Sequence, residues 1–301
     1  MKRHSLTKIT AIGSTAYDLL QEGQSGIVVG KTSKGAFVKT PSDRILYLTL
    51  EPYHGPLTIN LGGDTHALDE IEKGMGVTLR PGELSIPAID LCLKITPGER
   101  WCAPLPEARR RSAKERDEIL RTFAAEILTK IGEDDFPEVF LWLGALVRGE
   151  EIPASKPGSI LNSLLHLQEL IREGDVSKAG ELCHKLLGRG EGLTPAGDDL
   201  LLGWLLSLNR WGQILLPDIN LQPLNETIIQ TAYQKTTTIS ANLIECATRG
   251  EGDERLIAVL DALVCEVGEQ ENLIKELLSW GSSSGVYVFC GMAAAIGNIT
   301  K

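Results

Sequence analysis

The chain of 301 residues lacks several features that would assign it to a broad class of proteins. Aromatic residues make up only 5% of it, which disfavours the base-stacking surfaces that hold single-stranded nucleic acid. The sequence has no run of about 18 apolar residues, the length that a membrane-spanning helix needs. From composition we therefore expect neither binding of single-stranded nucleic acid nor a membrane-spanning helix.

Positive charge is also scarce. The chain has 30 Lys and Arg against 40 Asp and Glu, a formal net charge of −10. Residues 1–105 contain 11 residues of each sign, so the whole acidic excess lies in the remainder of the chain. An acidic C-terminal part repels nucleic-acid phosphates and anionic membrane surfaces. We therefore expect no nucleic-acid partner and no membrane partner.

Paired cysteines are absent as well. The six cysteines are scattered, mostly in apolar surroundings, with no C-x-x-C pair, which is typical of reduced thiols inside a cell. Residues 1–5 are not followed by an apolar stretch, so we expect no signal peptide and a cytoplasmic location. The histidines are dispersed, and the Gly-x-Ser-x-Gly run at 281–285 follows a predicted helix rather than a strand, so covalent catalysis has no candidate.

What is present begins with a β-rich region. Residues 9–20 predict a short helix that ends before Gly23, and evenly spaced short strands with turn residues between them follow. This spacing predicts a small antiparallel β barrel or sandwich. The expected strands are Ile27–Val29, Ala36–Lys39, Ile45–Leu50, Leu57–Leu61, Val77–Leu79 and Ile86–Ile95.

The pattern changes near Ala103-Pro104-Leu105-Pro106, which can continue neither a strand nor a helix. Beyond it the hydrophobic period is that of a helix. We therefore predict an α+β protein, with an all-β domain over 1–103 and a helical domain over 104–301. The expected helices are 107–131, 136–149, 158–173, 175–187, 194–212, 223–249 with a kink or cap at Thr236–Thr238, 253–267, 270–280 and 285–297.

A glycine-rich loop stands out within the helical part. Gly188, Gly190 and Gly192 alternate with other residues, so the backbone can adopt positive φ and expose its N–H groups. Thr194 followed by Pro195 is a helix-start signal. A glycine loop before a helix N-terminus is typical of anion binding. It is not a Walker or dinucleotide motif, because it lacks the Lys-Ser/Thr end and follows a helix.

Two adjacent acids, Asp198 and Asp199, lie in the first turn of that helix. They could complement the helix dipole, hold a divalent cation such as Mg²⁺ that bridges to an anionic ligand, or supply a base. Because a helix turns about 100° per residue, only one of them can face the glycine loop squarely. We expect that residue, the one that faces the ligand, to be Asp198.

A second loop, Gly281–Gly285, repeats this arrangement before an apolar helix, and its Ser283 and Ser284 can present hydroxyl and N–H groups. Two helix starts that converge bind an anion more selectively than one does. We therefore expect Gly192 and Ser283 to line one pocket, flanked by the β domain. We expect either Arg189 or the hydroxyls of Thr236–Ser240 to contact the anion there as well.

The motif Gly-Leu-Thr-Pro-x-Gly-Asp-Asp at 192–199 resembles the signature of a bacterial family. This family includes AllH, a subunit associated with oxamate carbamoyltransferase in anaerobic allantoin breakdown, a branch of purine degradation. The stretches Thr237-x-Ile239-Ser240 and Gly281-x-Ser283-Ser284-Gly285 are similar to weaker motifs of the family. The resemblance implies transfer of a carbamoyl group between oxalurate and phosphate, made together with partner subunits.

Three hypotheses follow for the function. The first is a carbamoyltransferase subunit that binds a small carboxylate or phosphate. The second is a Mg²⁺-dependent phosphoryl-transfer or hydrolysis enzyme, in which both acids are metal ligands; Mg²⁺ is the one cofactor considered. The third is an assembly or regulatory subunit without catalysis. The candidate catalytic residues are Asp198 and Asp199, and the candidate ligand-binding residues are Gly188, Arg189, Gly190, Gly192, Thr194, Thr237, Ser240, Ser283 and Ser284.

Overall fold

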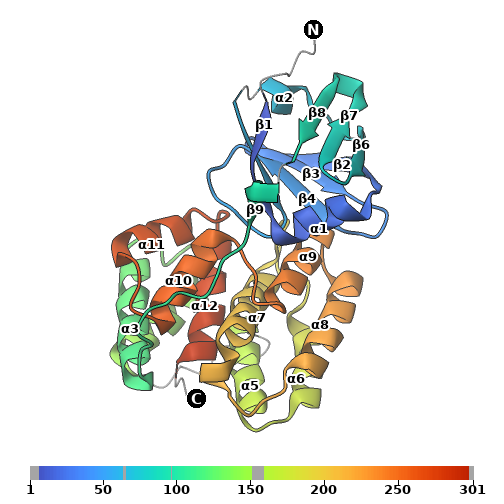
Figure 1. Cartoon of the computed structure of the whole chain (residues 1–301). Helices are drawn as coiled ribbons and strands as arrows, with labels where there is room; N and C mark the ends of the chain where they lie inside the picture. The colour runs from blue at the N-terminus through green and yellow to red at the C-terminus, as the bar shows by residue number, and fades with distance from the viewer. Residues whose placement is uncertain (1–6, 64–65, 96, 151–158, 298–301) are drawn as a thin grey trace. The chain divides into compact units, whose positions relative to one another are not determined.

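A computed structural model describes residues 7–63, 66–95, 97–150 and 159–297 (Figure 1). The chain divides into two compact units, Met1–Pro104 and Leu105–Lys301, which are described separately below. The first is dominated by strands and the second by helices, so the predicted α+β class is confirmed. The stretch 1–6 considered for a signal peptide and the first residue of the helix predicted at 158–173 lie outside the described residues.

Within the described part of the N-terminal unit, nine strands form one curled sheet, ordered β8-β7-β6-β2-β3-β4-β5-β1-β9. Most neighbours are antiparallel, but β4 with β5 and β1 with β9 are parallel pairs. Two short helices, α1 (Ser14–Glu22) and α2 (His66–Glu70), accompany the sheet. The strands are β1 (Lys8–Gly13), β2 (Ser25–Lys31), β3 (Gly35–Lys39), β4 (Ile45–Thr49), β5 (Thr58–Gly62), β6 (Gly76–Arg80), β7 (Glu83–Ile86), β8 (Leu91–Lys94) and β9 (Arg100–Trp101).

The alternation of apolar and polar residues explains why one face of this sheet is buried. In β4, Leu46 and Leu48 are fully buried and Tyr47 between them is partly exposed. Five of the six strands predicted from sequence are found. The predicted strand Ile86–Ile95 is wrong, because a 3-10 turn at Pro87–Ile89 separates the end of β7 from β8. The helix predicted at 9–20 is wrong in its first half. That half is strand β1, because a short apolar run cannot distinguish the two periods. The helix does end before Gly23, which adopts a φ of 65°.

The helical unit contains each helix that the 3.6-residue period predicts. One prediction is refined, because the stretch 223–249 forms two helices that are separated at Thr236 and Thr237. The helices are α3 (Ala113–Leu128), α4 (Pro137–Arg148), α5 (Ile160–Arg172), α6 (Val176–Leu186), α7 (Ala196–Leu215), α8 (Gln222–Lys235), α9 (Thr238–Ala247), α10 (Glu254–Val264), α11 (Gln270–Leu278) and α12 (Ser284–Ile296).

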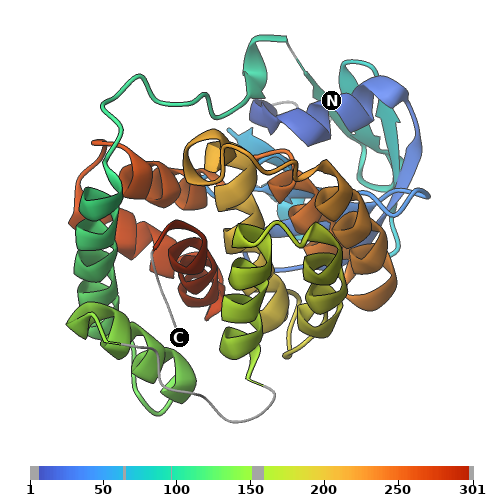
Figure 2. The same ribbon diagram turned by 90° about the horizontal axis from the view of Figure 1, so that it is seen from below.

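Helices α7 and α12 form the centre of this unit (Figure 2). Helix α12 is buried on nearly every side and packs against α7, α11, α5, α10, α3 and α4. Two glycines let α7 and α12 approach closely. A Cβ atom at Gly203 would lie 2.0 Å from the carbonyl oxygen of Val288, and one at Gly291 would lie 2.1 Å from that of Leu200. The backbones therefore touch directly, and this contact sets how the two helix starts are placed.

Candidate functional site

The glycine loop between α6 and α7 has the backbone that its sequence predicts. Gly188, Gly190 and Gly192 adopt φ values of 74°, 120° and 95°. A Cβ atom at Gly188 would lie 2.5 Å from the carbonyl oxygen of Lys235, and one at Gly190 would lie 2.6 Å from the amide nitrogen of Ala196. A Cβ atom at Gly192 would meet nothing within 4 Å. The first two glycines are thus required by both space and φ, and Gly192 by φ alone.

Three side-chain hydrogen bonds hold this loop in place. The Gly188 N–H donates to Asp198 Oδ1 at 2.8 Å, and the Thr237 hydroxyl donates to the Leu193 carbonyl at 2.6 Å. The hydroxyls of Thr194 and Ser284 hydrogen-bond to each other at 2.9 Å. These bonds come from α7, from the residue that caps α9 and from the first residue of α12. The loop is therefore fixed at both ends by the helices around it.

The middle of the loop offers backbone donors. Within the described part of the chain, the N–H groups of residues 190–193 make no hydrogen bond to a protein acceptor, and these residues are exposed. The first turn of α7 differs, because the Gly197 N–H donates to the Arg189 carbonyl and the N–H groups of Asp198 and Asp199 donate to the Pro195 carbonyl. An anion would consequently be bound by the loop rather than by the first turn of the helix.

Asp198 is an internal acceptor that holds the loop. Asp198 is only 2% exposed. One carboxylate oxygen accepts the Gly188 N–H and the other accepts the Thr236 hydroxyl. Burial raises the pKa of this carboxyl, while the Thr236, Gly188 and Ser240 donors oppose the shift. Asp198 contacts the glycine loop through Gly188, and both its oxygens are already occupied by the protein. That it is the acid facing the ligand stays a prediction.

Asp199 lies in a different environment, although it is also only 1% exposed. Its Oδ2 atom is buried and has no hydrogen-bond partner among the described residues. Burial raises the pKa of Asp199 to about 8, and the negative charge of Asp198 adds to the rise. The nearby hydroxyls of Ser284 and Thr194 lower the pKa by a smaller amount. Near neutral pH the side chain is therefore mostly a neutral acid, able to donate a hydrogen bond.

The remaining predicted site residues are Ser240, Arg189 and Ser283. The Ser240 hydroxyl is buried near Asp198 without a well-aligned hydrogen bond, and the Ser240 N–H donates to Thr237 at 3.1 Å. Arg189 is exposed. Ser283 precedes α12 without capping it through its side chain. The bond between Thr194 and Ser284 brings the two loops together, but a pocket shared by Gly192 and Ser283 stays a prediction.

The arrangement does not favour a metal site. Both oxygens of Asp198 accept protein hydrogen bonds, so this carboxylate would have to exchange them for a cation. The described residues contain no group of three or more His, Cys, Asp or Glu side chains that could hold a metal ion. Two adjacent acids without a third ligand are a weak Mg²⁺ site in a protein. The hypothesis of a Mg²⁺-dependent enzyme therefore gains no support from the geometry.

Sequence reasoning named the Thr236 hydroxyl as a possible ligand contact but missed its bond to Asp198, and it missed Tyr287 altogether. Thr236 donates to Asp198, and the run of three threonines at 236–238 was the available signal for it. Tyr287 lies one turn after Ser284 on α12 and is half-buried. Burial raises the pKa of Tyr287, and the charges of Cys290, Glu138 and Asp199 add to this rise. The position of Tyr287 one helical turn after Ser284 was the signal in the sequence that could have placed it near the site. A tyrosine by itself is no such signal, because tyrosines are common in helix cores.

The site lies within a segment that matches a known family. Residues 186–296 match the family model described as oxamate carbamoyltransferase subunit AllH. Over these residues, a little over a third of the chain, the sequence is similar to the AllH family. The resemblance predicted from the Gly-Leu-Thr-Pro-x-Gly-Asp-Asp motif is thereby confirmed. No curated protein and no solved structure matches the chain. The AllH segment begins just before the glycine loop and ends with α12, so it includes both loops and both acids.

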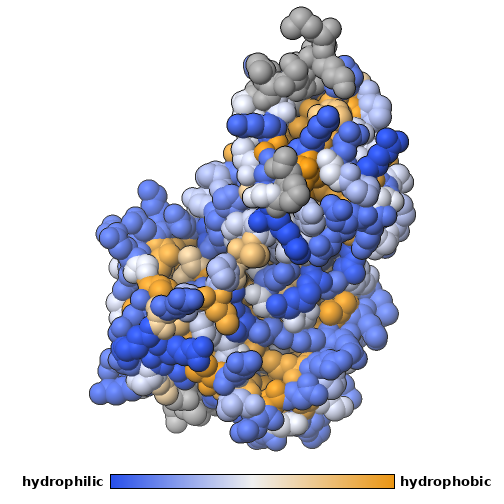
Figure 3. Space-filling view, in the orientation of Figure 1, coloured by the Kyte–Doolittle hydropathy of each residue, from blue (hydrophilic) through white to orange (hydrophobic). Residues whose placement is uncertain are grey.

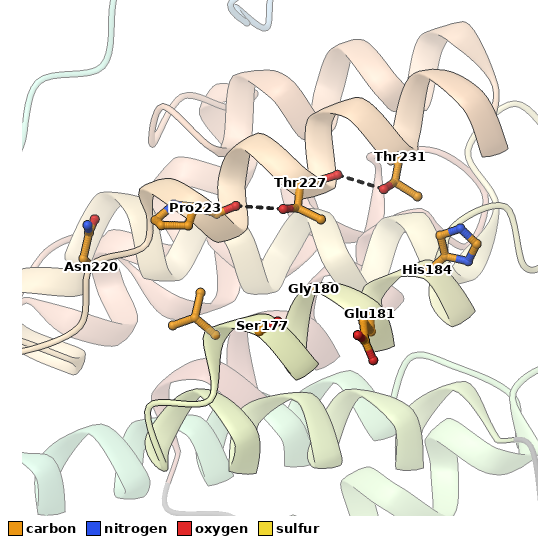
Figure 4. A pocket seen from close by; sticks show the side chains of 9 residues that line it. Ser177, Gly180, Glu181, His184, Asn220, Pro223, Thr227 and Thr231 are labelled. Carbon is orange, nitrogen blue, oxygen red and sulfur yellow. Dashed lines mark hydrogen bonds between the residues drawn. The ribbon is translucent and has the colours of Figure 1, made fainter.

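The described surface near the AllH segment also has hollows away from the acids. A groove of about 770 Å³ lies between α6 and α8, with His184 and Thr231 toward one end and Asn220 toward the other (Figure 4). None of the predicted site residues lines it. On the face seen in Figure 3, hydrophobic residues form patches separated by hydrophilic surface. None of the helices in the described ranges is both long and apolar enough to cross a membrane.

Proposed function

We propose that this chain is a subunit of a carbamoyltransferase of the oxamate and oxalurate class, and that it binds a small carboxylate or phosphate at the glycine loop. The observation that carries the proposal is the buried, unpartnered Oδ2 atom of Asp199. A buried polar atom without a partner costs free energy, of the order of 1–3 kcal/mol. Such an atom, close to the Thr194 hydroxyl at the end of the glycine loop, is suited to receive a polar ligand.

The reaction transfers a carbamoyl group with no net gain or loss of protons. A phosphate oxygen attacks the carbamoyl carbon of oxalurate, the bond from that carbon to the oxamate nitrogen breaks, and carbamoyl phosphate forms. The oxamate nitrogen gains one proton, and the attacking monohydrogen phosphate loses one. During the attack, negative charge develops on the carbamoyl oxygen. Donors that are already oriented toward that oxygen lower the barrier.

The chain supplies two kinds of donor for such an oxygen. The N–H groups of residues 190–193 are exposed on a loop that three side-chain bonds hold in place. Asp199 in its neutral form adds an O–H donor, in the way that a buried, protonated carboxylic acid can stabilise an oxyanion. Asp198 acts as a positioning residue, because it holds Gly188 and Thr236 rather than the ligand.

The partner subunits and the location of the protein are part of the same proposal. The family is described by its printed name as a subunit, so we propose that turnover requires other subunits of a complex. Six cysteines without a disulfide among them support a reducing compartment, and we propose the cytoplasm. An assembly or regulatory role without catalysis is the outcome if the experiment below fails.

Thermal unfolding of the full chain tests ligand binding. We expect oxamate and phosphate at millimolar concentrations to raise the melting temperature, because a ligand that binds only the folded state stabilises it by mass action. Mg²⁺ alone should have no such effect. Gly192→Val is the matched variant, since its side chain enters open space and costs about 1–3 kcal/mol of backbone strain.

The variant is expected to remain folded and to lose the response to both anions. A melting temperature that oxamate, oxalurate, carbamoyl phosphate and phosphate all leave unchanged would contradict the proposal. Stabilisation by Mg²⁺ in the absence of any anion would instead support the metal-dependent hypothesis.

A further inference from the structure

We propose that the site takes up its acidic ligand together with one proton, which lies between Asp199 Oδ2 and an oxygen atom of the ligand. This inference rests on the proposed function, because it concerns the same site. It goes further by fixing the chemical class of the ligand as an anion whose oxygen accepts a hydrogen bond. A cationic ligand or a bare metal ion would require the opposite, ionised form of Asp199.

The first argument is geometric. Asp199 is 1% exposed, and its Oδ2 atom has neither an N–H donor nor a hydroxyl donor among the described residues. The Ser284 and Thr194 hydroxyls near this carboxyl group compensate only part of the cost of burying an ionised carboxylate, and protonation removes the rest. An ionised Oδ2 would also repel an approaching carboxylate or phosphate. A protonated one attracts it, as a donor in a water-poor environment.

The second argument concerns the charges that face Asp199. The groups that shift its pKa are the hydroxyls of Ser284 and Thr194 and the carboxylate of Asp198, with no cation among them. Tyr287 faces it from α12, and Glu138 at the start of α4 acts on Tyr287 in turn. The charged members of this set are acids. An arriving anion adds one more negative charge, so it raises the pKa of Asp199 further.

The sign of the pH effect follows. The pKa of Asp199 in the free chain is about 8. Below that value the proton is already present, and an anion binds without proton uptake. Above it the proton must be taken from solvent as the anion binds, so affinity falls by about tenfold per pH unit. Oxamate is the suitable probe, because its carboxylate stays ionised throughout and phosphate titrates near this range.

Isothermal titration calorimetry of the full chain with oxamate tests the inference. Measurements at pH 6.5 and pH 9, each in two buffers of different ionisation enthalpy, give the number of protons bound per ligand. We expect close to none at pH 6.5 and close to one at pH 9, with a Kd roughly tenfold weaker at pH 9. Asp199→Asn keeps a neutral donor at this position. It should bind oxamate with no proton uptake and with a Kd that changes little with pH.

Asp218→Asn is the matched control, because Asp218 is exposed beyond the far end of α7 and the chemical change is identical. It should behave as the unaltered chain does. Binding of oxamate without proton uptake at pH 9 would overturn the inference and leave the proposed function standing. Proton uptake that persists in Asp199→Asn would overturn it too, by assigning the proton to another group. No binding of oxamate at either pH would overturn both proposals.

Discussion

Asp199→Ala is expected to lower kcat/KM for oxalurate phosphorolysis by about 100-fold to 1,000-fold in the complex assembled with its partner subunits. This is the usual cost of removing one donor from an oxyanion site. Alanine removes the carboxylic O–H group, and the neighbouring Thr194 and Ser284 hydroxyls already hydrogen-bond to each other. The acid is buried and contacts solvent little, so its loss cannot be replaced by a nearby exposed side chain.

Asp199→Asn separates this role from that of a base. Asparagine keeps a neutral hydrogen-bond donor of the same size, so we expect it to retain most of the activity, within about tenfold of the unaltered enzyme. If Asp199 acted as an ionised base, Asn and Ala would be equally inactive. Asp218→Ala is the control for general effects of removing an acid from the chain. Steady-state kinetics for the four proteins, with melting temperatures beside them, decides between the two roles.

The largest effect on stability is expected from Gly203→Ala in the middle of α7. Its new methyl group would lie 2.0 Å from the carbonyl oxygen of Val288 in α12, a contact with backbone that no rotamer change can relieve. Overpacking of a core costs about 1–3 kcal/mol when side chains can adjust, and here the helices themselves must separate. We therefore expect a loss of about 3 kcal/mol or more, a large part of a typical folding free energy of about 5–15 kcal/mol.

Gly212→Ala provides the matched control in the same helix. A Cβ atom there would lie 3.7 Å from Leu221 Cδ1, an ordinary contact, and alanine favours a helix over glycine by up to about 1 kcal/mol. We expect this variant to be as stable as the unaltered chain or slightly more stable. Urea unfolding of both variants measures the difference. Equal stability of the two would show that α7 and α12 do not depend on direct backbone contact.

Much of this fold could be predicted from sequence, because local signals agreed with the tertiary structure. The helix ends were marked by residues with a physical reason to be there, such as Pro195 before α7 and Gly149 after α4, where φ is 66°. The strands were marked by alternation, as in β4. Strand direction could not be predicted, since a parallel pair such as β4 and β5 has the same alternation as an antiparallel one.

The candidate site could be predicted in its residues but not in their roles. The spaced glycines and the adjacent acids marked the segment, and periodicity placed it at a helix start. The choice between Asp198 and Asp199 depends on which oxygen atoms the rest of the chain already occupies. Thr236 comes from 38 positions away in the chain, and Ser284 meets Thr194 across 90 positions. Partners so distant in sequence cannot be found from one sequence alone. The unpartnered atom on Asp199 favours that residue as the ligand contact.

The central claim is that Asp199 contacts the ligand where the starts of α7 and α12 meet. A crystal structure of the chain with oxamate tests it most directly. We predict an oxamate oxygen within hydrogen-bond distance of Asp199 Oδ2, about 2.5–3.0 Å, with further bonds from the N–H groups of residues 190–193. Oxamate bound elsewhere, for example in the groove between α6 and α8, with Asp199 Oδ2 left untouched, would contradict the account.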